Sequence, residues 1–353
     1  MQHPARANKR RIRREAVIVF QNLHSNNSAL PVTILCLLLL LGFGGLLIQT
    51  GCNPNSNSAR TGQGYNRQYT TVDRNSAEAP RLTIGSFNIQ SLGKTKMSKP
   101  EVVQILVDIT RRFDILAVQE LRDKDQNVIP EFLDLINADG RKYAAAVGPR
   151  QGYNIEGNKY FEQSVFIYDT TKVELIAPTY AAHDPDGIMH RSPYVGYFQS
   201  IEVNPADAFK FVLMNVHVDY DNPHLEFEAM REIIAGIYDN HKGEDDFILV
   251  GDLNDEPDRY RKYAWMNDQH PAIPNQWKTN LVQTENYDNI VFDALRTSEF
   301  TRQSGVLDLM SDYNLSITEA KKVSDHLPVW ATFSAFESPS AAITQGGAQG
   351  VIR

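Results

Sequence analysis

The chain has 353 residues, 35 of them basic and 43 acidic, and 42% are hydrophobic, which fits one large globular domain or two small ones. Residues 81–336 carry 25 of the basic and 39 of the acidic residues, a net charge of −14, which excludes attraction to nucleic acid through overall charge. A polyanion would need bound cations or a local basic patch to approach this domain. Cys36 and Cys52 both precede residue 81, so the domain has no disulfide and no thiolate metal site.

The residues before the domain predict a membrane anchor. A cluster of basic residues precedes an almost uninterrupted apolar run, Ala29–Ile48, and about 20 apolar residues span a bilayer. A basic flank favours an N-terminus in the cytoplasm, so we expect the domain outside the cytoplasm, in the periplasm or the extracellular space. A cleaved signal peptide and a lipoprotein cleavage site at Gly51-Cys52 are the alternatives. The expected segments are a basic cytoplasmic N-terminus (1–28), a single transmembrane anchor (29–50), a flexible tether (51–80), the folded domain (81–336) and a disordered tail (337–353).

Strands and helices alternate in the first part of the domain. Alternating apolar residues predict a first strand, and Ser98 and Glu101 are spaced as a capping box in front of a helix. The expected order begins with strand Leu82–Gln90, loop Ser91–Met97, a helix that follows the capping box and runs through about Arg112, strand Ile115–Glu120 and a helix around Ile129–Asp139. Strands are then expected at Tyr143–Val147, Gln163–Tyr168, Val173–Tyr180, Tyr197–Val203 and Phe211–Val218. The last elements are helix Pro223–His241, a strand that begins at Phe247 and ends at Gly251, a looser segment Asp258–Asn280, and strands Tyr287–Phe292 and Pro328–Phe333. The strand-rich middle predicts two sheets packed face to face, with helices outside.

The stretch Phe247–Asn254 combines a buried strand with polar residues at its end. Its four apolar residues are typical of a strand buried on both faces, and Gly251 ends that run. Asp252 and Asn254 follow two residues apart, so extended backbone would point both side chains to one side. An acidic turn that opens the next helix is the simpler interpretation of this stretch alone.

Other strands also end in polar residues that bind metals or phosphates. Each has a simpler explanation by itself: Asn88 as a turn residue, His217 as a core histidine, Asp325 as a cap. Eight such residues at successive strand ends are hard to explain by chance and favour a shared site. Oxygen ligands with two histidines suit Mg²⁺, Mn²⁺ or Ca²⁺ and suit zinc poorly. These strand-end residues are Asn88, Glu120, His217, Asp252, Asn254, Asp288, Asp325 and His326.

Motifs along nearly all of residues 81–336 resemble the endonuclease/exonuclease/phosphatase superfamily, and within it the deoxyribonuclease I-like branch. The resemblance implies a four-layer α/β/β/α sandwich, here behind a transmembrane anchor. The motifs are Phe87-Asn-Ile-Gln-Ser-Leu-Gly, Lys94-Thr-Lys-Met-Ser98, Asp114-Ile-Leu-Ala-Val-Gln-Glu-Leu-Arg-Asp123, Tyr160-Phe-Glu162, His217, Gly251-Asp-Leu-Asn254, Tyr287-Asp-Asn-Ile-Val291 and Ser324-Asp-His-Leu-Pro-Val329.

The resemblance also implies roles for individual residues. His217 and His326 would flank the scissile phosphodiester as general base and general acid, oriented by Glu162 and Asp288, and Asn254 would orient the phosphate. The implied metal ligands are Glu120, Asn88, Asp252 and Asp325, for Mg²⁺ or Mn²⁺ and, as a further option, Ca²⁺. The implied substrate contacts are Arg191 with a phosphate, and Arg122 and Tyr160 in the DNA minor groove.

These roles imply a divalent-metal-dependent endonuclease that hydrolyses DNA, works as a monomer without a protein partner, and contacts the membrane through its N-terminal helix. Two alternatives remain open: a sphingomyelinase-like or inositol-phosphatase-like phosphoesterase, and a catalytically silent binding module. Three positions depart from the nuclease pattern. Asp255-Glu-Pro-Asp-Arg259 lacks the family's disulfide, and Asn289 and Gln90 stand where secreted nucleases carry basic residues.

Overall fold

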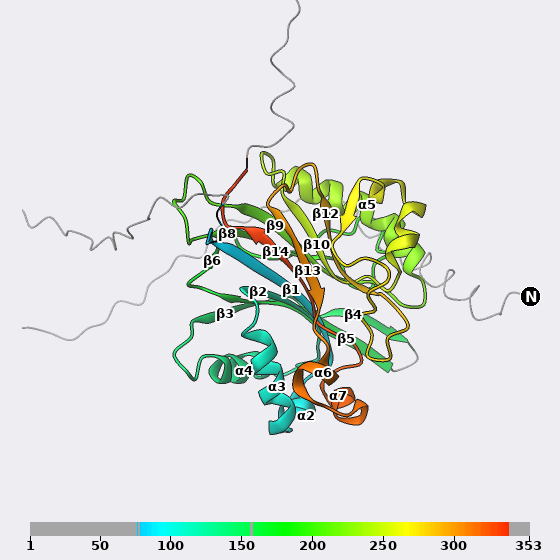
Figure 1. Ribbon diagram of the computed structural model, residues 1–353. Helices are drawn as coiled ribbons and strands as arrows, with labels where there is room; N and C mark the ends of the chain where they lie inside the picture. The colour runs from blue at the N-terminus through cyan, green and yellow to red at the C-terminus, as the bar shows by residue number, and fades with distance from the viewer. Residues whose placement is uncertain (1–75, 77, 156–157, 339–353) are drawn as a thin grey trace, which may run out of the picture. The chain divides into compact units, whose positions relative to one another are not determined.

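The computed structural model describes residues 76, 78–155 and 158–338, which form two seven-stranded mixed sheets and the helices that cover them (Figure 1). The strands are β1 (Arg81–Leu92), β2 (Ile115–Leu121), β3 (Tyr143–Val147), β4 (Gln151–Ile155), β5 (Asn158–Asp169), β6 (Val173–Leu175), β7 (Tyr180–Ala181), β8 (Tyr194–Ser200), β9 (Lys210–His217), β10 (Phe247–Asp252), β11 (Gln269–Pro271), β12 (Asp288–Asp293), β13 (Phe300–Val306) and β14 (Val329–Ser334). The helices are α2 (Lys94–Met97), α3 (Pro100–Thr110), α4 (Val128–Ile136), α5 (Pro223–Asn240), α6 (Leu309–Tyr313) and α7 (Ile317–Val323), with short 3₁₀ turns η1 (Pro257–Lys262) and η2 (Ala264–Met266).

The first sheet has the strand order β13-β14-β1-β2-β5-β3, with β4 paired to β5. The second has the order β11-β12-β10-β9-β8-β6, with β7 paired to β8. In Figure 1, α2, α3, α4, α6 and α7 lie on one side of the two sheets and α5 lies on the other. The predicted sandwich of two sheets with helices outside is therefore confirmed.

Side-chain alternation in β10 shows why its run of apolar residues folds this way. Ile248 and Val250 belong to the hydrophobic core between the two sheets, which also contains Phe166 of the first sheet. Phe247 and Leu249 point the other way and pack with the residues of α5. Since successive strand residues face opposite sides, burial on both faces requires the continuous apolar run that the sequence contains.

The middle of each sheet contains a pair of parallel strands, and these pairs position the polar strand ends. β1 runs parallel to β2, with Asn88 opposite Gln119, and β9 runs parallel to β10, with His217 opposite Asp252. Parallel neighbours end at the same edge of a sheet. The polar residues that follow them therefore gather at one edge of the sandwich.

The first helical segment differs from the prediction. Residues 94–97 form the short helix α2 rather than a loop, and the Ser98 hydroxyl donates to the carbonyl of Thr95. Helix α3 starts only at Pro100, whose fixed φ suits a first helical position, and Lys99 precedes it without a side-chain cap. The predicted capping box at Ser98 and Glu101 is therefore wrong.

Several other elements were misplaced or missed. The predicted strand Val173–Tyr180 is two short strands, β6 and β7, with Pro178 between them, because proline cannot donate a ladder hydrogen bond. The predicted strand Tyr197–Val203 lies at Tyr194–Ser200 instead. Strands β4, β11 and β13 and helices α6 and α7 are absent from the predicted order. A capping box is present at Ser316 and Glu319, where α7 starts.

The ends of the chain lie largely outside the described residues. The predicted N-terminus (1–28), anchor (29–50) and nearly all of the tether (51–80) belong to that part, and none of the helices that are described is long and apolar enough to cross a bilayer. The predicted tail begins too early, because Glu337 donates its backbone N–H to Asp207 and Ser338 donates its own to Glu299. Two residues of the expected tail thus belong to the fold.

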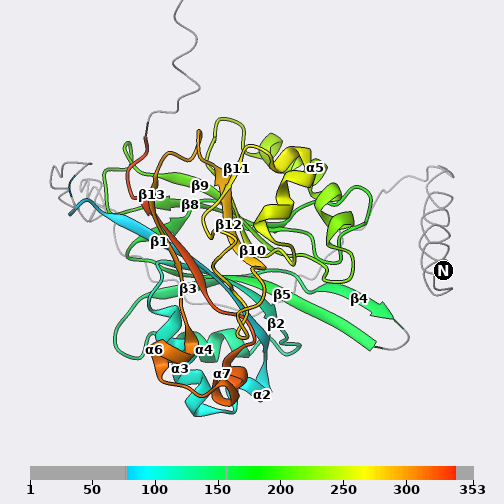
Figure 2. The ribbon, with the colours of Figure 1, turned by 45° about the vertical axis from the view of Figure 1, so that its right-hand side comes forward.

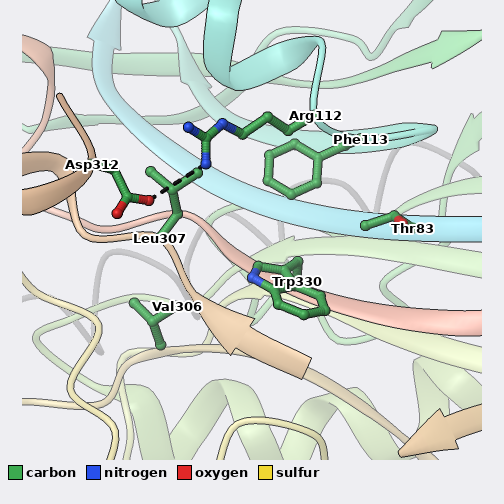
Figure 3. A pocket seen from close by; sticks show the side chains of 7 residues that line it. All are labelled: Thr83, Arg112, Phe113, Val306, Leu307, Asp312 and Trp330. Atoms are coloured by element: carbon green, nitrogen blue, oxygen red, sulfur yellow. Dashed lines mark hydrogen bonds and ion pairs between the residues drawn. The ribbon is translucent and has the colours of Figure 1, made fainter. Parts of the chain in front are cut away.

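A surface pocket of about 460 Å³ lies between the end of α3 and strands β1, β13 and β14 (Figure 3). Its walls include Phe113 and Trp330, and an ion pair of 3.4 Å between Arg112 and Asp312 crosses one side. The pocket has none of the predicted site residues in its lining. The candidate site lies at the opposite, carboxyl ends of the central strands.

Candidate active site

The backbone is strained where the central strands end. Gln90, Ser91, Glu120 and Asn254 have φ values of 45°, 60°, 63° and 49°, a region that costs a residue other than glycine about 1–3 kcal/mol. The pairing of β1 with β2 also shifts register between Asn88 and Leu92. Such bulges redirect side chains at sheet edges, and here they turn polar side chains toward one another.

Gly251 allows β9 and β10 to approach closely. It has φ +147°, and a Cβ at this position would lie 2.0 Å from the carbonyl oxygen of Val216. Any other residue would push the strands apart. The glycine that ends the apolar run therefore places Asp252 next to His217.

Asn88, Glu120 and Asp252 form the first group of contacts. The Asn88 amide nitrogen donates to Glu120 Oε1 over 3.3 Å and to Asp252 Oδ2 over 3.0 Å. Asn88 and Asp252 are each 1% exposed. Two carboxylates from different sheets thus converge on one amide group.

The other oxygen of Glu120 is held from the opposite side. Glu120 Oε2 accepts the backbone N–H of Ser91 over 3.0 Å and an N–H of Arg122 over 3.0 Å. The left-handed backbone of Ser91 and Glu120 permits this contact. Glu120 is therefore oriented with one oxygen toward Asn88 and Asp252.

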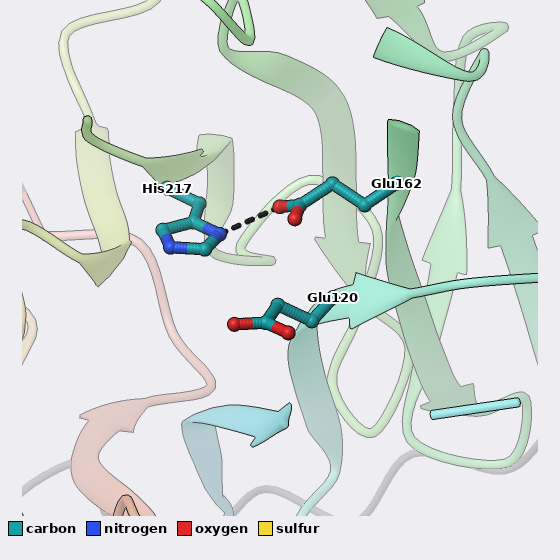
Figure 4. Close-up of side chains that lie close together, drawn as sticks. All are labelled: Glu120, Glu162 and His217. Atoms are coloured by element: carbon teal, nitrogen blue, oxygen red, sulfur yellow. Dashed lines mark hydrogen bonds and ion pairs between the residues drawn. The ribbon is translucent and has the colours of Figure 1, made fainter. Parts of the chain in front are cut away.

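His217 and Glu162 form a buried pair across the two sheets (Figure 4). His217 Nδ1 lies 2.6 Å from Glu162 Oε1, so the ring donates through Nδ1 and leaves Nε2 for other partners. Arg191 supports the pair from behind: its Nε donates to the carbonyl of His217 over 2.8 Å and lies 3.5 Å from Glu162. This cluster has one imidazole, one carboxylate and one guanidinium.

His326 and Asp288 form a second pair of the same kind. His326 Nδ1 lies 2.8 Å from Asp288 Oδ2, and the backbone N–H groups of Tyr287 and Asp288 both donate to the Thr279 hydroxyl. His326 follows α7 on the first sheet's side, whereas Asp288 begins β12 of the second sheet. This pair also joins the two sheets.

Asp252 lies between the two imidazoles. Its Oδ2 is 3.6 Å from Nε2 of His217 and also 3.6 Å from Nε2 of His326. The two Nε2 atoms are therefore no further apart than twice that distance, and both face the same space. The two pairs therefore converge on one carboxylate oxygen.

The proton affinities of the two pairs follow from their neighbours. Burial alone would raise the pKa of Glu162, but the charge of His217, together with Arg191, outweighs it and lowers the pKa to about 2. Burial alone would lower the pKa of His326, but the carboxylates of Asp288 and Asp252 raise it to about 10. The pKa of His217 is also raised, because Glu162 outweighs burial, with Arg191 acting in the opposite direction.

The remaining predicted residues lie around this centre in different ways. Asn254 donates its amide to the carbonyl of Val218 over 2.8 Å and its backbone N–H to Asp252. Arg122 and Tyr160 are largely exposed, at 42% of the side chain and 45% of the residue respectively. Arg191 is engaged with protein groups, and its contact with a phosphate stays a prediction.

Asp325 is the predicted ligand that the structure does not bring into contact with the others. Its side chain is exposed, and its carboxylate forms no hydrogen bond or ion pair within the described part of the chain. It lies close enough to His326 to raise the pKa of that ring. Its role as a ligand stays a prediction.

The donor atoms present fit a hard divalent cation. Glu120 Oε1 and Asp252 Oδ2 both lie within 3.3 Å of one Asn88 nitrogen, so two carboxylate oxygens already share a small space with an amide group. Oxygen donors of this kind suit Mg²⁺, Mn²⁺ or Ca²⁺. Glu120, Glu162 and His217 form one group of potential ligands within 4.8 Å of one another, and Asp252, Asp288 and His326 form another.

Three buried polar residues that hold the site together escaped the sequence reasoning. Gln119 on β2 donates to Asn215 on β9 over 2.8 Å, and Asn215 donates to the carbonyl of Val118, so side chains fasten the two sheets together directly beneath the strand ends. The Ser324 hydroxyl donates to the carbonyl of Asn88 and accepts the N–H of His326. Asn215 lies two residues before His217 on the same face of β9, and this spacing is the signal that could have identified it.

Lys96 is a fourth such residue, and it belongs to the quoted motif Lys94-Thr-Lys-Met-Ser98. Its ammonium group donates to the carbonyls of Ile89 and Val323. These two hydrogen bonds connect the end of β1 to the segment that carries Asp325. Burial lowers the pKa of Lys96 to about 8, although Asp325 and Glu120 act to raise it. Lys96 thus supports the backbone on which Asn88 and Asp325 lie.

The two-sheet fold and this site are features of one class of protein. Comparison with known families identifies that class. The model of the "Endonuclease/Exonuclease/phosphatase family" matches residues 85–326. The chain belongs to this family, and the resemblance to its deoxyribonuclease I-like branch is confirmed.

The curated relatives are deoxyribonucleases. The chain is 31% identical to deoxyribonuclease gamma of Rattus norvegicus over 267 residues, which cover 70% of this chain and 83% of the relative. It is 28% identical to deoxyribonuclease-1 of Homo sapiens, with 71% and 92% covered. Among solved structures, an endonuclease/exonuclease/phosphatase family protein from Bacteroides thetaiotaomicron superposes with a TM-score of 0.52 at 15% identity, over 72% of this chain and 98% of that one, which shows a shared fold.

Proposed function

We propose that the protein is a divalent-metal-dependent endonuclease that hydrolyses DNA phosphodiesters. The observation that carries this proposal is the position of Asp252 Oδ2, 3.6 Å from Nε2 of both His217 and His326. Two imidazoles oriented by separate carboxylates can act on opposite sides of one phosphate. The deoxyribonuclease relatives support DNA as the substrate.

Each imidazole has a defined part in the proposed reaction. Glu162 and Asp288 hold the Nδ1 protons, so Nε2 of each ring is the atom that takes or gives a proton. His326 is held in the protonated form by Asp288 and Asp252 and would give its proton to the leaving oxygen. His217, whose proton affinity Arg191 reduces, would take a proton from the attacking water.

Other residues would hold the substrate and the cation. Glu120 and Asp252, with Asn88, would bind a Mg²⁺ or Mn²⁺ ion, which when bound supplies positive charge for the phosphate oxygens. Asn254 would orient the phosphate, and Asp325 would complete the ligands. Arg122 and Tyr160 would contact the minor groove, since both are exposed near the same edge.

Chelation tests this proposal directly. The full chain would be incubated with plasmid, single-stranded DNA, RNA and sphingomyelin, with and without EDTA. We expect hydrolysis of DNA that EDTA abolishes and Mg²⁺ or Mn²⁺ restores, and a similar loss in Glu120→Gln, which removes a charge but keeps the shape. Full activity in excess EDTA would contradict the mechanism, and cleavage of sphingomyelin alone would favour the lipid-directed alternative.

We also propose that the domain is held outside the cytoplasm by a single transmembrane segment at residues 29–50. The apolar run and its basic flank support this orientation. Protease added to intact cells, after permeabilisation of an outer envelope where one exists, should degrade the domain. Protection equal to that of a cytoplasmic marker would reverse the assignment.

A further inference from the structure

A second group of carboxylates lies at the end of β10 opposite the active site. Asp246 directly precedes β10, Glu299 directly precedes β13, and Glu337 follows β14. Each offers a carboxylate oxygen, and the three oxygens lie within 4.8 Å of one another. Since a strand rises about 3.3 Å per residue, the six residues of β10 separate this group from Asp252 by roughly 20 Å. The group is therefore distinct from the active site.

Two members of this group each bury one carboxylate oxygen that accepts no hydrogen bond. Asp246 is 1% exposed and Glu299 is 2% exposed, and the buried atoms Asp246 Oδ1 and Glu299 Oε2 accept no hydrogen bond. None of the ion pairs found in the described ranges includes either residue. Burying charged carboxylates without counter-charge is costly, so these groups require a cation or protons.

The neighbouring Glu244 shows the contrast. Its Oε1 accepts the backbone N–H groups of Asp245 and Asp246 over 2.9 and 3.0 Å, and its Oε2 accepts the Tyr197 hydroxyl over 3.0 Å. Both oxygens of Glu244 are therefore used by the protein. Asp246 and Glu299 are instead left with an oxygen that no protein donor reaches.

Backbone N–H groups orient two of the three carboxylates, those of Glu299 and Glu337. Glu299 Oε1 accepts the N–H of Ser338 over 2.6 Å, and Glu337 Oε2 accepts the N–H of Lys210 over 3.2 Å. One oxygen of each side chain is thus fixed by the chain, and Glu299 keeps its second oxygen without a donor. Glu337 is partly exposed, so the group reaches the protein surface at this residue.

We propose that Asp246, Glu299 and Glu337 bind a divalent cation, for which Ca²⁺ is the best match, and that this ion fastens the C-terminal segment to the sandwich. The ligands are oxygen atoms from three segments far apart in the sequence, and Ca²⁺ accepts such irregular sets of six to eight oxygens, whereas Mg²⁺ demands a near-octahedral set. Without an ion, burial raises the pKa of Asp246, and the neighbouring Glu299 and Glu337 raise it further. Shared protons are therefore the competing explanation.

Calcium titration of the full chain separates the two explanations. After chelator treatment, Ca²⁺ binding would be measured by calorimetry and by thermal denaturation, in Glu120→Gln protein to weaken the active-site ligands. We expect one Ca²⁺ to bind and to raise the Tm by about 5–10 °C at 100 times its Kd. Adding Asp246→Asn or Glu299→Gln should remove both the binding and the shift, whereas the matched control Glu244→Gln should keep both.

The opposite pattern would overturn the proposal. No stoichiometric Ca²⁺ binding in Glu120→Gln, or equal binding after Asp246→Asn, would show that the group is not a cation site. A higher Tm of Glu299→Gln in chelator, with no response to Ca²⁺ in either protein, would show that the carboxyl groups share protons. Should Asp246→Asn fail to fold, Glu337→Gln replaces it, since this side chain is partly exposed, and it should lose the same bound ion.

Discussion

The two histidine–carboxylate pairs are built alike but have different neighbours. In each, an imidazole attached to one sheet meets a carboxylate attached to the other. The first pair, His217 with Glu162, has Arg191 behind it. The second pair has no such neighbour: in the described part of the chain, the ion pairs of His326 and Asp288 include no arginine or lysine.

This difference shows how one motif can serve two roles. Arg191 acts against the rise in the pKa of His217 that Glu162 and Asp252 cause, whereas Asp288 and Asp252 raise the pKa of His326 to about 10. Paired acid–base catalysis requires one ring to start without its second proton, and Arg191 is the group that favours this state at His217.

The largest expected effect comes from removing the imidazoles themselves. His217→Ala and His326→Ala should each lower kcat on DNA by on the order of 10²–10⁴ with little change in Tm, because each removes a proton-transfer step. The double variant should lose much less than the product of the two single losses. Wild-type turnover by His217→Ala would show that this histidine is structural.

A diester with an aryl leaving group sharpens the assignment of the two rings. A good leaving group departs without a proton, so His326→Ala should lose less activity on bis(p-nitrophenyl) phosphate than on DNA. His217→Ala should lose a similar factor on both substrates. The reverse result would exchange the roles of acid and base between the two rings.

Replacing the orienting carboxylates should have smaller effects than replacing the rings. Asp288→Asn should be milder than His326→Ala, because the ring remains and Asp252 still stabilises its charge. Glu162→Gln should leave Arg191 unopposed beside His217 and lower the pKa of that ring, which should move the corresponding limb of the kcat/KM profile to lower pH.

Arg191 provides the control for this shift. Adding Arg191→Gln to Glu162→Gln removes the unopposed cation, so the limb of the kcat/KM profile that reports His217 should return toward its original pH. Arg191→Gln alone should move this limb to higher pH. An unchanged pH profile in all three variants would show that Arg191 does not cause the difference between the two histidine–carboxylate pairs.

The smallest expected effect is on stability, and the two pairs should differ in its pH dependence. The pKa of Glu162 is lowered to about 2 in the folded protein. Its contribution to the free energy of unfolding is therefore present above its unfolded pKa, near 4.5, and is lost as pH falls through about 2. The pKa of His326 is raised to about 10 in the folded protein. Its contribution to the free energy of unfolding is therefore present below its unfolded pKa, about 6.5, and is lost as pH rises through about 10.

Urea unfolding of metal-free protein would measure both contributions. The stability difference between wild type and Glu162→Gln should shrink in acid, and the difference between wild type and His326→Gln should shrink in alkali. His183→Gln, at an exposed position, controls for loss of a histidine. Differences that stay flat from acid to alkali would contradict the assigned proton affinities.

The sequence by itself determined the central strands of both sheets and the polar residues at their ends. The run Phe247–Val250 and Gly251 predicted a buried strand delivering Asp252, because side-chain alternation and the steric freedom of glycine are local properties. The motifs around Asn88, Glu120 and His326 identified the family for the same reason: they are short contiguous patterns. The structure confirmed the sheets, and the match to the family model confirmed the family.

Only the tertiary structure decided which of these residues meet. His217 and Glu162 are 55 residues apart, and His326 and Asp288 are 38 apart, so their contacts depend on how one sheet packs on the other. The supporting contacts of Arg191, and the group formed by Asp246, Glu299 and Glu337, likewise follow from packing between distant segments. Local pattern carries no distance information across a core: the family resemblance implied the two histidine–carboxylate pairs, and only the folded chain shows their contacts and the further partners around them.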